Sequence, residues 1–149
     1  MLENVGIEFW NIINTTSATI DWIIFFLLIY LIGNRKISNK INLLMIFFIL
    51  LFMCFINLSE LFANIKIVIC MILGTLYYKL SYKDKIHKCI LINLIFWLGI
   101  MITEAISVSL VVSLNNLNNI QVIIDNSIYR LEAVIIAKLL LFLEIIIFK

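Results

Sequence analysis

The sequence contains no proline, only four glycines and a single histidine, and charged residues make up just 13% of its 149 positions. Soluble domains average about 25% charged residues, so this shortage of charge excludes an ordinary globular core. The lack of proline and the scarcity of glycine predict continuous helices, and they argue against the interrupted helices of many secondary transporters. The net charge of +2 is too small to predict nucleic acid as a partner.

Cysteine and histidine are too few and too scattered to build a chemical site. Cys54, Cys70 and Cys89 lie far apart, in or beside apolar stretches, without a CxxC spacing. Metal or redox chemistry requires clustered ligands, so we expect small buried residues here, with no metal and no cofactor. His87 lies in a basic stretch, so we expect it to be a solvated loop residue. A Cys–His protease site with Cys89 would also need an orienting group, which argues against that alternative. We therefore expect no catalytic residue and no enzymatic activity.

Apolar residues account for 64% of the chain and gather into five long runs. A helix needs about 20 mainly apolar residues to cross a bilayer. In lipid, every backbone N–H and C=O must be paired within the segment, which favours helices. The sequence therefore predicts an all-α membrane protein, a bundle of about five transmembrane helices in a single polytopic domain over residues 1–149. The expected spans are residues 12–32, 41–58, 61–78, 90–113 and 128–148.

The basic residues are concentrated in alternate loops. Residues 33–40 carry three Lys or Arg residues and residues 79–88 carry four, whereas residues 114–127 carry none. Cytoplasmic loops are enriched in Lys and Arg, so the N-terminus is expected outside and the C-terminus in the cytoplasm. Residues 1–21 contain no basic residue, which predicts a retained span and no signal peptide. Residues 2–12 are expected either to lie on the outer surface as an amphipathic segment or to continue the first helix.

Three ionisable residues lie inside the expected spans: Asp21, Glu104 and Lys138. They lie about 17, 23 and 15 Å from the cytoplasmic ends of their helices, at 1.5 Å per residue. Such residues are costly in lipid and usually face a partner or a wet cavity, so we expect Lys138 to pair with Glu104 or Asp21. The pair could fix helix register, act as a polar switch or belong to an ion pathway. Asn118 and Asn119, in the longest outer connection, complete the set of candidate ligand-binding or signalling residues.

Several short stretches together resemble the N-terminal membrane sensor region of accessory-gene-regulator-type (AgrC-like, GHKL) receptor histidine kinases. They are Ile20-Asp21-Trp22, Asn34-Arg35-Lys36, Tyr77-Tyr78-Lys79 with the basic loop up to Lys88, Glu104-Ala105, and the stretch from Tyr129 through Lys138 to Leu140. The resemblance covers nearly all of the chain. It departs from the family in that the 149 residues contain no kinase core, so autophosphorylation is not carried over.

The resemblance implies a sensor in the cell membrane of a Gram-positive bacterium that binds a small extracellular peptide, often a cyclic thiolactone or lactone. It also implies signalling through the last span and self-association as a homodimer, with membrane lipid and the peptide as partners. Two other functions are consistent with the composition. One is a small solute-binding membrane subunit of a transporter, and the other is a structural or immunity-type membrane protein without a small ligand.

Overall fold

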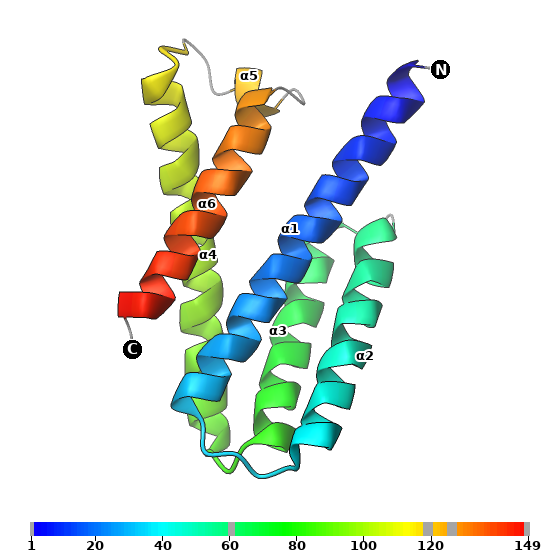
Figure 1. Cartoon of the computed structure of the whole chain (residues 1–149), viewed down its shortest axis with the longest axis vertical. Helices are drawn as coiled ribbons and strands as arrows, with labels where there is room; N and C mark the ends of the chain where they lie inside the picture. The colour runs from blue at the N-terminus through cyan, green and yellow to red at the C-terminus, as the bar shows by residue number, and fades with distance from the viewer. Residues whose placement is uncertain (1, 60–61, 118–120, 125–127, 148–149) are drawn as a thin grey trace. The chain divides into compact units, whose positions relative to one another are not determined.

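The computed structural model of the chain describes residues 2–59, 62–117, 121–124 and 128–147 (Figure 1). This part of the chain is all-helical, as expected, and its only β-type pairing is an isolated bridge between Arg35 and Tyr82. The helices are α1 (Leu2–Ile32), α2 (Asn39–Leu58), α3 (Ala63–Ser81), α4 (Ile86–Leu114), α5 (Gln121–Ile124) and α6 (Ile128–Ile147).

Three of these helices contain segments that are long and apolar enough to cross a membrane: Phe9–Ile32, Asn39–Leu58 and Ile86–Leu114. They correspond to the first, second and fourth expected spans. The third and fifth expected spans form helices of 19 and 20 residues, α3 and α6, and their crossing of the membrane stays a prediction. Helix α1 begins at Leu2, so the structure favours a helical continuation over a separate surface segment at this end.

The surface of α2 shows why these helices suit lipid. Its buried residues are few, namely Asn42, Met53 and Ile56. Nine large apolar side chains on the same helix are at least 45% exposed: Ile41, Leu43, Leu44, Phe47, Phe48, Leu51, Phe52, Phe55 and Leu58. A soluble protein rarely exposes a contiguous apolar surface of this kind, because water contact is unfavourable for it. A hydrocarbon environment removes that penalty.

The chain divides into two compact units, Met1–Trp97 and Leu98–Lys149, with the boundary inside α4. We describe each unit by itself, and the prediction of one polytopic domain stays a prediction. In the first unit, α1 packs against α2, and α2 packs against α3 as its antiparallel neighbour (Figure 1). The antiparallel hairpin of α2 and α3 is the arrangement that the short connection between their apolar runs predicts.

Aromatic side chains fill the core of the first unit. Trp22 and Phe25 of α1 pack edge to face, with ring centroids 5.5 Å apart. Phe26 lies 4.7 Å from Tyr77 of α3, and Phe25 lies 5.0 Å from Phe96 of α4. Contacts of this kind add about 0.5–1.5 kcal/mol each beyond the area they bury. They fix α1 against α3 and α4, and they hold Trp22 in a defined position.

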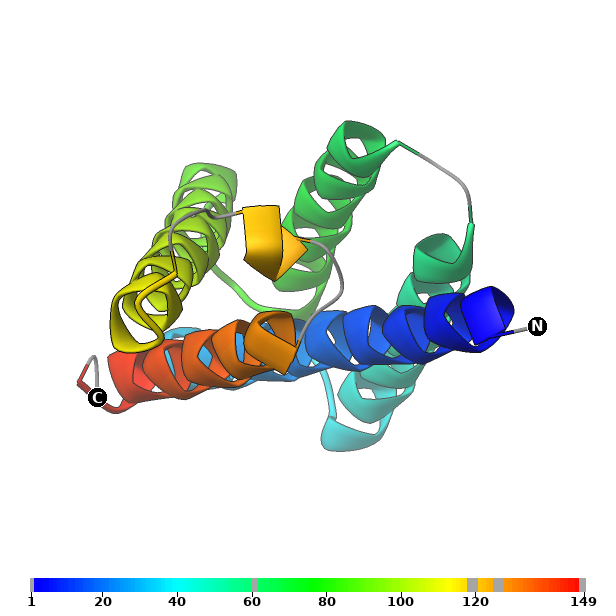
Figure 2. The same ribbon diagram turned by 90° about the horizontal axis from the view of Figure 1, so that it is seen from above.

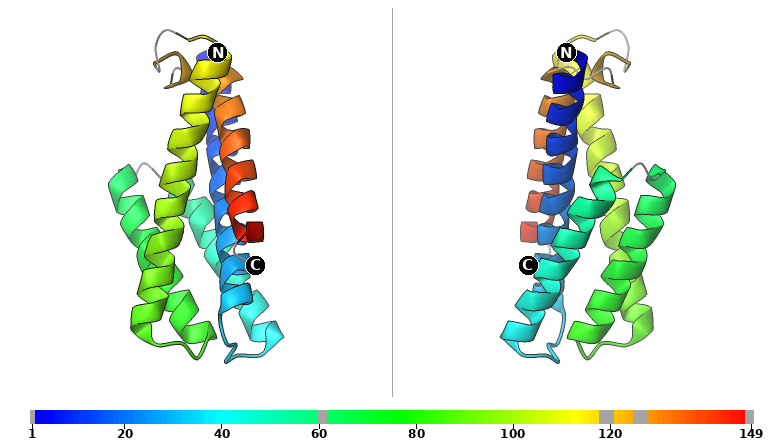
Figure 3. Two further views of the ribbon diagram at one scale, coloured as in Figure 1. Left: turned by 90° about the vertical axis from the view of Figure 1, so that its left-hand side faces the viewer. Right: turned by 90° about the vertical axis from the view of Figure 1, so that its right-hand side faces the viewer.

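In the second unit, the later part of α4 runs antiparallel to α6, as the left view of Figure 3 shows, and α5 lies beside the start of α6 (Figure 2). Val111, Ile123 and Ala133 form its buried apolar cluster, which joins all three helices. Helix α4 ends in a left-handed turn at Asn116, where φ is 50° and the Leu117 N–H donates to the Val112 carbonyl at 3.1 Å. Asparagine tolerates this conformation, which commonly terminates a helix.

Candidate functional site

The two basic loops of the first unit are joined by their backbones. The Lys36 N–H donates to the Ser81 carbonyl at 2.9 Å, and the Lys83 N–H donates to the Asn34 carbonyl at 2.9 Å. Their seven Lys and Arg residues therefore gather at one end of this unit. This supports the expectation that both loops lie on the same side of the membrane, and which side that is stays a prediction.

Asp84 organises the charges of this basic end. It accepts a hydrogen bond from Lys88 Nζ at 2.9 Å and another from the Tyr78 hydroxyl at 2.9 Å. Lys79 Nζ donates to the backbone carbonyl of Asp84 at 3.0 Å. The hydrogen bond from Lys88 is the main reason that the pKa of the Asp84 carboxyl is lowered, and partial burial opposes it. Asp84 thus ties α3 to the start of α4.

A cavity lies between the helices of the first unit, toward the α2–α3 hairpin end that faces away from the basic loops, and its mostly apolar wall includes several side chains with polar groups. It has a volume of about 240 Å³, and we call it the Asp21 pocket. Its polar lining consists of Asp21 and Trp22 from α1, Asn57 from α2, Lys66 and Cys70 from α3, and Trp97 from α4. Residues distant in sequence therefore meet around one cavity.

Asp21 brings a buried carboxylate to this pocket. Its side chain is 7% exposed, and it lies near the middle of the apolar segment Phe9–Ile32. Burying a carboxylate is costly unless polar groups compensate it, and in a membrane segment such a residue marks a functional site by default. Asp21, which the sequence singled out, therefore lines a cavity in the first unit.

Two hydrogen-bond donors of the pocket are not used within the described part of the chain. The Trp22 indole N–H faces the Cys70 thiol, which is a weak acceptor, and it makes no hydrogen bond of normal geometry. Asn57 Nδ2 is also buried without a hydrogen-bond partner in the described residues. A buried donor left unsatisfied costs about 1–3 kcal/mol, so each of these groups favours an acceptor in the cavity.

Lys66 adds a positive charge whose position is fixed by the end of α2. Its Nζ donates to the Asn57 carbonyl at 3.2 Å and to the Ser59 carbonyl at 2.9 Å. These carbonyls lie at the C-terminus of α2, where the backbone leaves acceptors without helical partners and cations are favoured. The ammonium group therefore caps one helix while it lines the Asp21 pocket.

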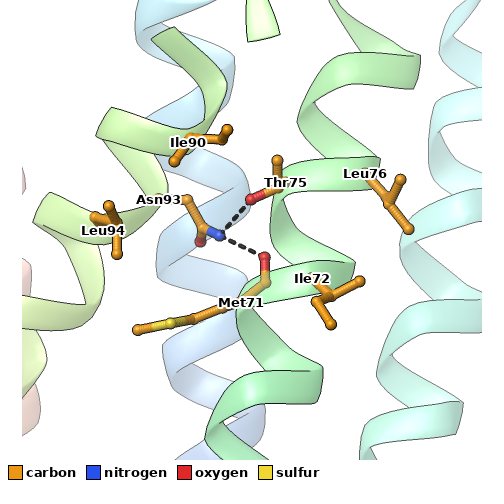
Figure 4. A pocket seen from close by; sticks show the side chains of 7 residues that line it. All are labelled: Met71, Ile72, Thr75, Leu76, Ile90, Asn93 and Leu94. Atoms are coloured by element: carbon orange, nitrogen blue, oxygen red, sulfur yellow. Dashed lines mark hydrogen bonds between the residues drawn. The ribbon is translucent and has the colours of Figure 1, made fainter. Parts of the chain in front are cut away.

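A second cavity of about 350 Å³ lies between α3 and α4 and is mostly apolar. Figure 4 shows Asn93 at its centre, with its amide directed toward α3. Asn93 Nδ2 donates to the Met71 carbonyl at 2.6 Å and to the Thr75 hydroxyl at 2.8 Å, while Asn93 Oδ1 accepts from Trp97 Nε1 at 3.1 Å. Asn93 therefore joins α3 to α4 and also fixes Trp97, which is a wall of the Asp21 pocket.

Gly74 makes room for this arrangement. A β-carbon at position 74 would lie 2.8 Å from Asn93 Oδ1 and 3.1 Å from the Phe25 ring. Real β-carbons essentially never approach an oxygen that closely, so a larger residue would displace Asn93 or the ring. The absent side chain thus allows α1, α3 and α4 to meet.

In the second unit, Lys138 of α6 lies near Glu104 of α4. The distance from Lys138 Nζ to Glu104 Oε1 is 3.9 Å, and the side chains are 12% and 56% exposed respectively. Glu104, one of the two carboxylates expected as a partner, therefore lies within ion-pair distance of Lys138. The separation is longer than the 2.7–2.9 Å of a charge-assisted hydrogen bond, so the two groups attract each other without a tight contact.

The remaining expectations from the sequence concern two asparagines, a metal site and the cysteines. Asn118 and Asn119 lie outside the described residues. Within the residues that are described, no group of three or more His, Cys, Asp or Glu side chains is placed to hold a metal ion. Cys54, Cys70 and Cys89 are free thiols.

Reasoning from sequence did not identify Trp22, Asn57 or Asn93 as site residues. Asn57 and Asn93 are amides inside long apolar runs, and that feature alone could have marked them. Trp22 carried no such signal, because a tryptophan is equally suited to packing or to the membrane interface.

Comparison with known proteins adds no identity to this geometry: no family model matches the chain, and neither a curated protein nor a solved structure does.

Proposed function

We propose that the chain is the multi-pass membrane sensor module of a receptor, without enzymatic activity of its own, that binds a small extracellular peptide. In this proposal five helices cross the cell membrane, with the N-terminus outside and the basic loops in the cytoplasm. The module self-associates through its apolar faces, and α6 passes the signal to a cytoplasmic partner. The sequence resemblance supplies the ligand class, and the geometry of the first unit supports a binding role.

The Asp21 pocket is the observation that carries this proposal. It contains a buried carboxylate, a fixed ammonium and two unused donors. A protein that only filled the membrane would not need these groups, because each is costly to bury. The pocket also lies toward the hairpin end opposite the basic loops. With those loops in the cytoplasm, it would be reached from outside.

The second unit supports the signalling half of the proposal. A ligand shifts a helix only when it binds two arrangements of that helix with different affinity. The Lys138–Glu104 pair at 3.9 Å is a polar interaction between two largely apolar helices, and a second one joins Asn115 Nδ2 to Glu132 Oε2 at 3.2 Å. A small change in the position of α6 would strengthen or release the Lys138–Glu104 pair, so this pair suits an element with two arrangements.

The size of the pocket also favours a second candidate, a small solute-binding subunit of a transporter. Pockets for drug-sized ligands measure about 300–1,000 Å³. The Asp21 pocket, at about 240 Å³, would accept a single amino-acid residue rather than a whole peptide. A receptor would therefore use this pocket for one anchoring residue of its peptide, whereas a solute subunit would enclose its whole ligand.

A binding experiment on the whole chain in lipid nanodiscs tests the receptor proposal. A panel of short cyclic thiolactone, cyclic lactone and linear peptides would be titrated, with fluorescence anisotropy as the readout. We expect saturable binding of at least one peptide at micromolar concentration, which corresponds to about −8 kcal/mol. Failure of every peptide to bind saturably would overturn the receptor proposal. Binding of free amino acids alone would establish the solute-binding alternative.

A further inference from the structure

Several hydrogen-bond donors of the Asp21 pocket lack acceptors in the described residues. Trp22 Nε1 and Asn57 Nδ2 supply N–H groups without hydrogen-bond partners in the described residues. Lys66 Nζ has three N–H groups, and two carbonyls of α2 account for two of them. The side chains that carry these donors line one cavity, and an oxygen that can accept several hydrogen bonds would satisfy them there.

The charges of the pocket restrict which oxygen this can be. Lys66 and Asp21 carry opposite charges, so the two together add no net charge to the cavity. A bare anion would gain from Lys66 but would be repelled by the carboxylate of Asp21, and a bare cation would meet the reverse problem. A ligand group that carries an ammonium beside an acceptor oxygen matches both charges. An ionised carboxylate offers about four acceptor positions, so Asp21 can receive an ammonium in addition to contacts within the protein.

We infer that the Asp21 pocket binds an α-ammonium group together with the adjacent carbonyl or carboxylate oxygen. This inference rests on the proposed function, because it names the part of the ligand that enters the pocket. The ammonium donates to Asp21, and the oxygen accepts from Trp22 and Asn57. The same chemistry occurs at the N-terminus of a peptide and in a free amino acid.

The rest of the lining sets the side chain that accompanies this group. Met53 and Ile67 line the cavity alongside the two tryptophans, so a small apolar side chain would contact apolar surface. The centroids of Trp22 and Trp97 are 6.3 Å apart, and their rings meet edge to face. Aromatic faces also attract an ammonium, which adds to its interaction with Asp21. An alanine residue at the N-terminus is therefore a suitable probe.

The test uses the whole chain in nanodiscs and three probes: the dipeptide alanylalanine, its N-acetylated form and free alanine. Ligand-observed NMR titration follows the signals of the probe itself. Tryptophan fluorescence reports binding as well, because two of the three tryptophans line the pocket. We expect the dipeptide to bind saturably. Acetylation removes the charge, and it should weaken binding at least about tenfold, the loss expected for one charge-assisted hydrogen bond.

Three substitutions each remove a charge or a hydrogen-bond donor while nearly preserving side-chain size. Asp21→Asn should weaken binding of the dipeptide about as much as acetylation does. Trp22→Phe and Asn57→Leu each remove a neutral donor and should weaken it about three- to tenfold. Trp10→Phe is the matched control for Trp22→Phe, because Trp10 does not line the pocket. Circular dichroism and thermal unfolding would identify any variant that fails to fold, and the remaining variants then carry the test.

The outcomes separate this inference from the receptor proposal. Equal affinity for alanine and the dipeptide would support the pocket chemistry with a free amino acid as its source, and a clear preference for the dipeptide would assign it to a peptide. The inference is overturned if neither alanine nor the dipeptide binds. It is also overturned if the affinity for the dipeptide changes neither on acetylation nor in any folded pocket variant. A cyclic peptide that binds the wild type and these variants equally would also overturn it, while the receptor proposal would stand.

Discussion

Replacement of Asn93 by alanine should destabilise the first unit measurably, because this side chain donates two hydrogen bonds from α4 to α3. The substitution removes the hydrogen bonds to the Met71 carbonyl and the Thr75 hydroxyl, at 2.6 and 2.8 Å. It also removes the acceptor of Trp97 Nε1 at 3.1 Å. Interhelical hydrogen bonds in membrane proteins contribute about 0.6 kcal/mol on average and up to about 1.7.

The two interhelical bonds of Asn93 therefore contribute about 1.2 kcal/mol together, with the third bond adding up to about 1. We expect Asn93→Ala to lower the free energy of unfolding by about 1–2 kcal/mol. Reversible unfolding in mixed micelles, or steric trapping in bicelles, would measure this change. The emission of Trp97 should shift as well, because its indole N–H loses its partner.

Two threonines provide a matched comparison. Thr75 accepts from Asn93 across the α3–α4 contact, whereas Thr103 donates to the Ile100 carbonyl of its own helix at 2.9 Å. Thr75→Val should cost about 0.6 kcal/mol and lose that effect when Asn93 is already alanine. Thr103→Val should have little effect. The reasoning is refuted if Asn93→Ala changes the unfolding free energy by less than about 0.5 kcal/mol, or if the two threonine variants behave alike.

Three further predictions concern topology, output and pH. Cysteines introduced at positions 36 and 85 in a cysteine-free background should be protected from a membrane-impermeant reagent in intact cells. A cysteine at position 118 should be labelled, and the opposite pattern would reverse the predicted orientation. In a chimaera with a histidine kinase core, Lys138→Met should alter kinase output without abolishing peptide binding, and unchanged output at normal expression would leave Lys138 a packing residue. Because the pKa of Asp84 is lower in the folded protein than in the unfolded chain, its stabilising contribution is full above the unfolded value of about 4. That contribution should disappear as the pH falls through the lowered pKa, so the wild type should lose more stability on acidification than Asp84→Asn, and equal losses would contradict this role.

Helix positions followed from the sequence because the apolar runs and polar loops are long and distinct. The run expected at 41–58 became α2 at Asn39–Leu58, and the run at 128–148 became α6 at Ile128–Ile147. Helix α4 starts at Ile86 rather than at residue 90, because its first residues are polar but still helical. The four-residue helix α5 was not predicted, since a single helical turn has no periodicity to detect.

The site followed from the sequence only where a full charge revealed it. Asp21 and Lys138 were recognisable because charges are rare in apolar segments. The face that each helix turns inward was not recognisable from the sequence, since residues that face lipid are as apolar as those that face a neighbouring helix. Helix α4 illustrates this: Asn93 is buried at 2% exposure, whereas Leu94 and Ile95 beside it are exposed. The contacts of Asn93 and Asn57 therefore depend on packing that periodicity does not encode.

Polar contacts set the register of α2, α3 and α4 in the first unit. Lipid contacts apolar side chains as favourably as another helix does, so apolar packing alone discriminates weakly between arrangements. The Tyr77 hydroxyl donates to Asn42 Oδ1 at 2.9 Å and links α3 to α2 near the basic loops. Lys66 links the same helices at their other end, and Asn93 links α4 to α3. The α2–α3 pair and the α3–α4 pair thus each have a polar contact that would be lost if the helices slid past each other, whereas α1 is held by the aromatic contacts of Phe25 and Phe26.

Trp22 and Asn57 differ from these linking residues in one respect. Their side-chain N–H groups are buried, yet neither makes a hydrogen bond that joins two helices in the described part of the chain. A buried donor without a partner costs about 1–3 kcal/mol. The scaffold already obtains its register elsewhere, so stability alone gives no reason to retain both donors beside a cavity. Their cost is recovered when an acceptor enters the Asp21 pocket, and this is the physical reason for regarding the pocket as a binding site rather than a packing defect.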